Sequence, residues 1–118
     1  MPITILDGPT IPAGQSLSDG IDCSAGEIVR ITIPQEYTPA NMTFQVSSNG
    51  ELYNDLYDSD GNEVTIVTKP DTGIVIRDRA WVRSIKFIKF RSGTRQHPVA
   101  QKVNCKCAIA IDTPEAAP

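Results

Sequence analysis

The chain has 118 residues, of which 40% are hydrophobic and 21% charged, and its net charge is −3. This length is typical of one domain with its own core, and the composition excludes wholesale disorder. The negative charge argues against nucleic-acid binding, which requires a basic surface. No apolar run reaches the length of a membrane span, and the N-terminus lacks the regions of a signal peptide, so we expect synthesis in the cytoplasm.

The first third of the chain predicts short strands separated by turns. Residues 3–6 are a short strand candidate that a Gly-Pro turn ends. Residues 27–33 form a clearer one, because Val29, Ile31 and Ile33 alternate with polar or charged residues. We therefore expect a strand with one face in the core.

Residues 41–93 organise the middle of the chain. Met42, Phe44 and Val46 share one parity, which is typical of a half-buried strand. That strand leads into a turn at Asn49 and Gly50, because both residue types tolerate a positive φ. This segment predicts the start of a β-unit.

Further short elements follow this turn. Residues 51–67 contain two strand candidates around a turn at residues 58–63, and residues 74–76 form another. Residues 77–81 are either a single helical turn or a loop. All these elements are too short for a helical domain.

The last two strand candidates are the most apolar. In residues 85–90 the alternation breaks where Phe87 and Ile88 are adjacent, so this strand is either buried on both faces or carries a bulge. Residues 103–111 form the last strand. Its predicted core face carries Val103, Cys105, Cys107, Ile109 and Ile111.

The three cysteines exclude a closed set of internal disulfides, because their number is odd. Cys105 and Cys107 lie on the predicted core face, and Cys23 shares its parity with Ile21. We therefore expect buried free thiols that pack as small apolar groups. A disulfide from Cys23 to one of the pair, or a bond between subunits, is the alternative.

Many short strands with turns between them predict an all-β fold, a single-domain antiparallel β-sandwich of the jelly-roll type. We assign residues 15–111 to this domain. Residues 1–14 and 112–118 show little apolar periodicity, so we expect an N-terminal arm and a flexible tail.

The sequence carries no catalytic motif, so we expect neither an enzyme nor a cofactor. It has one histidine and lacks a nucleophile elbow and a Gly-rich phosphate loop. Residues 58–63 resemble the start of a calcium loop, but the twelfth position is Lys69 instead of Glu. We therefore expect a hydrated hairpin turn there and no metal.

Three residues form a candidate contact site. Tyr53, Asp55 and Tyr57 share one face if residues 51–58 form a strand. Aromatic and acidic groups together bind sugars through stacking and hydrogen bonds, but they serve equally in cross-strand packing or in a protein interface. We favour packing or an interface over a glycan site.

Two segments carry a first resemblance. Residues 44–53 (FQVSSNGELY), followed later by residues 84–87 (SIKF), resemble the hairpin and basic-apolar strand of discoidin-type galactose-binding-like domains. This resemblance implies a β-sandwich of the jelly-roll kind, with loops that bind glycans or lipids.

A wider resemblance covers residues 11–111, which look like small virion proteins of tailed bacteriophages. The matching segments, in order, are residues 11–22, 33–34, 37–47, 53–65 and 85–101. The resemblance implies a non-enzymatic structural protein of the virion, and among these we favour a head decoration or cement protein. A neck, collar or tail accessory protein is the alternative within the same particle, and a carbohydrate-binding module for host attachment is the alternative from another class.

This resemblance also implies partners. We expect contacts with the major capsid protein or other virion subunits, and no contact with nucleic acid or membrane. We also expect a homo-oligomer, with a trimer as the specific hypothesis, because local three-fold positions are common docking points on icosahedral shells.

Overall fold

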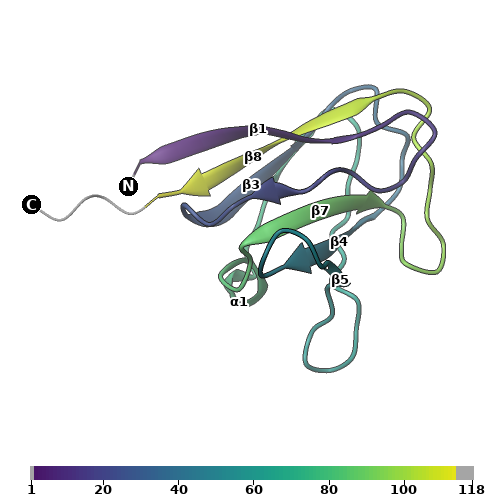
Figure 1. Ribbon diagram of the computed structural model, residues 1–118. Helices are drawn as coiled ribbons and strands as arrows, with labels where there is room; N and C mark the ends of the chain where they lie inside the picture. The colour runs from purple at the N-terminus through teal and green to yellow at the C-terminus, as the bar shows by residue number, and fades with distance from the viewer. Residues whose placement is uncertain (1, 114–118) are drawn as a thin grey trace, which may run out of the picture.

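Two antiparallel four-stranded sheets pack face to face in the computed structural model, which describes residues 2–113 (Figure 1). Sheet A contains β1 (Ile3–Ile11), β8 (Cys105–Asp112), β3 (Glu27–Ile33) and β6 (Thr72–Val75). Sheet B contains β2 (Ile21–Asp22), β7 (Phe87–Ser92), β4 (Met42–Ser47) and β5 (Asn54–Asp55). This arrangement confirms the predicted all-β antiparallel sandwich.

The order of the strands is that of a jelly roll. Antiparallel pairing joins β1 with β8, β2 with β7, β3 with β6 and β4 with β5. These pairs form one long ribbon, rolled up so that alternate pairs fall in opposite sheets. Contacts of β3 with β8 and of β4 with β7 then complete the orders β1-β8-β3-β6 and β2-β7-β4-β5. An eight-stranded double sheet of this kind is a jelly roll.

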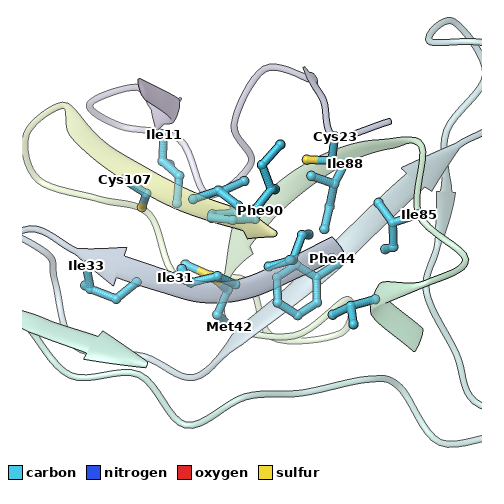
Figure 2. Packing of buried hydrophobic residues seen from close by; sticks show 14 of the residues in the cluster. Ile11, Cys23, Ile31, Ile33, Met42, Phe44, Ile85, Ile88, Phe90 and Cys107 are labelled. Carbon is cyan, nitrogen blue, oxygen red and sulfur yellow. The ribbon is translucent and has the colours of Figure 1, made fainter. Parts of the chain in front are cut away.

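The core lies between the two sheets (Figure 2). Phe44 of β4 and Phe90 of β7 meet edge to face, with ring centroids 5.5 Å apart, and Ile31 and Ile33 of β3 enter from the opposite sheet. Trp81 stacks on Phe44 with ring centroids 5.0 Å apart. Each aromatic pair adds about 0.5–1.5 kcal/mol beyond its buried area. The aromatic cluster therefore fastens α1 (Arg79–Val82) to the sandwich.

β1 belongs to sheet A, although the sequence suggests an arm over residues 1–14. The strand pairs with β8 of the same chain, and a register shift between Asp7 and Thr10 divides it. Beyond this shift Ile11 is fully buried, whereas Ile3 and Ile5 before it are 53% and 54% exposed. The shift reverses which parity faces the core, and this reversal hides the apolar periodicity of the strand.

Strand β8 begins two residues later than expected. Val103 precedes it in a loop and is 46% exposed, so the prediction that it faces the core is wrong. Cys105 and Cys107 do face the core, and Cys23 is buried too; all three thiols are free. The strand also includes Asp112, the first residue of the predicted tail, whereas residues 114–118 lie outside the described residues.

Strands β4 and β7 are regular along their whole contact and largely covered on both sides. Their pairing shows no register shift, so burial on both faces, and not a bulge, explains the broken alternation in β7. Phe44 and Phe90 fill the core side, while Thr43 and Arg91 on the other side are also buried. Side chains of the hairpin of residues 56–66, including Glu63, cover that outer side.

The segment after β6 forms a helical turn, one of the two structures expected there. Asp78 caps α1, since its Oδ1 accepts the Ala80 backbone N–H at 3.1 Å. Within residues 2–113 no helix has the length and hydrophobicity needed to cross a bilayer.

The buried thiols predict slow native labelling by a disulfide reagent. Burial raises the pKa of Cys23 and of Cys107 to about 12, so little thiolate, the reactive form, is present at neutral pH. We expect all three cysteines to react rapidly only after unfolding in urea. Ser48→Cys, which adds an exposed thiol, is the positive control for native labelling. Rapid native reaction of Cys105 and Cys107 in the unmodified chain would contradict this expectation.

The same thiols predict a loss of stability in alkali. The unfolded thiols lose their protons near their ordinary pKa of about 8.5. The folded thiols of Cys23 and Cys107 keep theirs up to about 12. Between these values the unfolded state binds fewer protons, so the free energy of unfolding falls as the pH rises. Urea denaturation across this range checks the slope, which should become shallower in Cys23→Ala.

Candidate functional site

Of the strand expected over residues 51–58 only β5 (Asn54–Asp55) forms; Tyr53 precedes it, and Tyr57 follows it in an isolated bridge with Glu63. Asp55 ends β5 opposite Gln45 of β4. The Tyr53 ring lies beneath Lys89 of β7, with the ammonium 4.4 Å from the ring centroid. Tyr57 hydrogen-bonds the Arg95 guanidinium, which is the main reason that the pKa of this group is raised. Asp55 and Tyr57 therefore share Arg95, whose Nε lies 3.3 Å from Asp55 Oδ2, whereas Tyr53 has Lys89 as a separate basic neighbour and lines a different hollow from Tyr57.

Arg91 is the centre of the outer side of sheet B. Its Nη1 donates to Asp55 Oδ1 at 2.8 Å and its Nη2 to Glu63 Oε2 at 2.7 Å. Its Nε donates to the Thr43 hydroxyl at 3.0 Å. The Arg91 side chain is only 8% exposed, so this guanidinium is buried with its two carboxylates. Such a pair with satisfied hydrogen bonds holds its segments in one arrangement.

The network extends to neighbouring polar groups. Gln45 Nε2 also donates to Asp55, and the Arg95 backbone N–H donates to Glu63 at 3.2 Å. Burial raises the pKa of Asp55, but the hydrogen bonds from Arg91 and Gln45 outweigh it, and the net pKa lies below its ordinary value. Asp55 is thus an ionised structural residue that the side chains of Arg91, Gln45 and Arg95 already engage.

Tyr53 also has a packing role. Its hydroxyl occupies the space where a side chain at residue 20 would begin, since a Cβ built on Gly20 would lie 2.0 Å from that oxygen. Gly20 therefore admits the ring, and Lys89 covers it. Two of the three candidate residues, Tyr53 and Asp55, are consequently committed to the fold.

A cleft of about 580 Å³ opens beside this network. Its walls are the hairpin of residues 56–66, the segment from β6 to α1, and Trp81. Tyr57 lies on its wall and is 41% exposed. One face of the Trp81 ring is stacked on Phe44, so only the remainder of the indole is open to the cleft. The cleft combines an apolar floor with a polar mouth.

The turn at residues 58–62 closes the hairpin by its own hydrogen bonds, as predicted. Asp58 Oδ1 accepts the backbone N–H groups of Asp60 and Asn62 at 2.9 and 3.0 Å. Among the described residues no group of three or more His, Cys, Asp or Glu side chains is arranged to hold a metal ion. The hairpin is thus shaped by backbone contacts to Asp58.

The outer face of sheet A is a second surface, and it exposes apolar side chains. The strand registers place Ile5, Ala110, Arg30 and Val75 in one row across β1, β8, β3 and β6. The next row carries Asp7, Ala108, Thr32 and Gly73. Ile5 is 54% and Val75 70% exposed. This face therefore carries exposed apolar residues at both ends of its central row, with Arg30 between them.

The Arg91 network escapes sequence reasoning. Arg91 lies 28 and 36 residues from its carboxylate partners, so no local pattern joins them. The sequence offers one indication: Arg91 shares its parity with Lys89 in β7, so both side chains point to the outer side of sheet B.

Comparison with known proteins adds no relative: no protein-family model and no curated protein matches the chain.

Replacing Arg91 should strongly destabilise the fold. Arg91→Met leaves Asp55 and Glu63 without their buried counter-charge, and we expect the free energy of unfolding to fall by about 3–5 kcal/mol. Arg95→Met is the matched control, because the Arg95 side chain is 61% exposed and its loss should cost less than about 1 kcal/mol. Urea denaturation of both variants measures the difference. Equal effects would contradict the central role of Arg91.

Proposed function

We propose that this chain is a non-enzymatic structural protein of a tailed-bacteriophage virion, and specifically a head decoration or cement protein. The outer face of sheet A carries the proposal. Its two outer strands expose Ile3, Ile5 and Val75, and exposed apolar side chains on a sheet face suit a surface that a partner covers. Jelly rolls recur in viral capsid proteins, where sheet faces and edges supply subunit contacts.

The proposed partners are the major capsid protein or other subunits of the virion, and copies of the chain itself. The outer face mixes apolar ends at Ile5 and Val75 with the charge of Arg30. Mixed surfaces of this kind suit protein interfaces. We propose a homo-oligomer, with a trimer as the specific arrangement, because a three-fold complex matches local three-fold positions of an icosahedral shell.

The chemistry of the described groups supports a role without catalysis. Burial raises the pKa of all three thiols, which keeps them in the poorly nucleophilic protonated form. The buried guanidinium of Arg91 and its carboxylates are paired with one another. These groups stabilise the fold and are not poised for reaction.

A carbohydrate-binding module ranks second. The cleft with Tyr57 and Trp81 favours it, because sugars stack on exposed aromatic rings. However, Asp55 and Tyr53 are already held by Arg91 and Lys89, and Phe44 covers one face of Trp81. The outer face of sheet A therefore carries more weight than the cleft.

The outer face predicts a surface-specific loss of association. Ile5→Glu combined with Ile3→Glu places two charges on exposed positions of sheet A, so the fold should persist while binding to capsids or to other copies weakens by at least about tenfold. Leu52→Glu is the control, since Leu52 is 69% exposed but lies outside sheet A. Sedimentation velocity and co-sedimentation with capsids measure the effect. Unchanged association of the double variant would contradict the proposed interface.

For the second function we expect a negative result. Because Tyr53 and Asp55 are engaged in the fold, a glycan array should show no saturable ligand. A clear ligand whose binding disappears in Tyr57→Ala would favour the carbohydrate-binding module. Thermal unfolding of that variant controls for damage to the fold.

A further inference from the structure

Strand β6 is the outer strand of sheet A on the side of the cleft. The Ile76 N–H donates to the Val29 carbonyl at 3.0 Å, and Ile74 pairs with Ile31. Hydrogen bonding along an antiparallel strand alternates between its two edges, so Gly73 and Val75 direct their N–H and C=O groups away from β3. Among residues 2–113 no backbone partner reaches them on that edge.

The cleft lies directly beside this open edge. Six of the nine partly buried apolar side chains that pack against the core line it: Leu56, Val64, Ile66, Ile74, Ile76 and Trp81. On the opposite side sheet B ends in β5, which has two residues. The two sheets are therefore not closed along this side, and the apolar layer between them is only partly covered.

We propose that an extended segment of another polypeptide chain adds to β6 as a fifth strand of sheet A and fills this cleft. The main chain of the segment pairs with Gly73 and Val75. Because side chains of a strand alternate, every second residue of the segment falls on the same side as Ile74 and enters the cleft. Backbone pairing thus supplies affinity, and the apolar pockets select alternating apolar residues.

The charged residues that line the cleft indicate which residue types the bound segment carries at its ends. The cleft is lined by three carboxylates, Asp58, Glu63 and Asp78, and by one guanidinium, Arg77. Glu63 is paired with Arg91. Asp58 and Asp78 use Oδ1 to accept backbone N–H groups and keep a negative charge at the mouth. The occupant that fits is therefore an apolar alternating segment with Lys or Arg at its ends.

A second copy of this chain fits less well. Its exposed strand end, residues 3–7, contains Asp7 and no basic residue. The inference stands on the edge and the cleft, independently of the virion role. Under that role, the segment is an arm of a neighbouring subunit of a different kind.

A synthetic peptide tests the inference directly. The probe is acetyl-Lys-Val-Thr-Val-Thr-Val-Lys-amide, and the readout is the fluorescence of Trp81, which is the only tryptophan and lies in the cleft. We expect saturable binding with a blue shift of the emission. The same peptide with N-methyl groups on alternate residues along one edge should lose binding, and methylation along the other edge should not.

Variants of the protein distinguish backbone pairing at the edge of β6 from charge attraction at the mouth of the cleft. Val75→Pro removes the outward N–H of an exposed residue and should weaken binding about tenfold or more, while Val75→Thr should bind within about twofold of the wild type. Asp58→Asn combined with Asp78→Asn keeps both capping oxygens but removes the charge, and it should weaken binding several-fold at low salt.

Other outcomes would overturn the proposal. Binding that is insensitive to Val75→Pro and to N-methylation would mean a cleft ligand without strand pairing. Self-association that depends on Val75 would make a second copy the occupant. A glycan that shifts the Trp81 emission where the peptide does not would assign the cleft to sugar. None of these outcomes decides whether the outer face of sheet A binds a capsid, which Ile3→Glu and Ile5→Glu test separately.

Discussion

The structure depends on the burial of two sheet faces against each other around Phe44. This ring contacts Phe90 within sheet B, Trp81 of α1, and the layer of isoleucines from sheet A. Hydrophobic burial of this kind is proportional to the area removed from water, so it favours any arrangement that covers the ring. The jelly-roll order satisfies it by bringing strands from both ends of the chain into sheet A.

Arg91 allows sheet B to carry a second, polar layer on its outer side. A charge at this depth is tolerated because two carboxylates and a hydroxyl satisfy its donors. The hairpin of residues 56–66 is thereby fixed over β4 and β7. Since the same hairpin forms one wall of the cleft, the ionic network also determines the shape of the cleft.

The two surfaces proposed for contacts differ in kind. The outer face of sheet A offers side chains, whereas the edge of β6 offers backbone groups beside an apolar cleft. Val75 belongs to both, because its side chain points to the face while its main chain points to the edge.

The fold class, and the strands whose alternation is local, can be predicted from the sequence alone. The period of two in residues 30–33 and 42–47, and at Cys105 and Cys107, identifies core faces because neighbouring side chains alternate whatever the strand pairs with. At the start of β3 a register shift between Ile28 and Arg30 buries Ile28 and leaves Val29 only half-buried, so the core position expected for Val29 is wrong. Turn residues with few backbone choices likewise mark the hairpin at residues 58–62.

What lies opposite those faces depends on contacts between segments that are distant in the sequence. The role of β1 was hidden because its register shift changes the core-facing parity, and the burial of Arg91 depends on carboxylates that are 28 and 36 residues away. The open edge of β6 and its cleft depend on which strands end each sheet. Strand order arises from contacts between distant segments, and a local pattern carries no information about which distant segment will supply them.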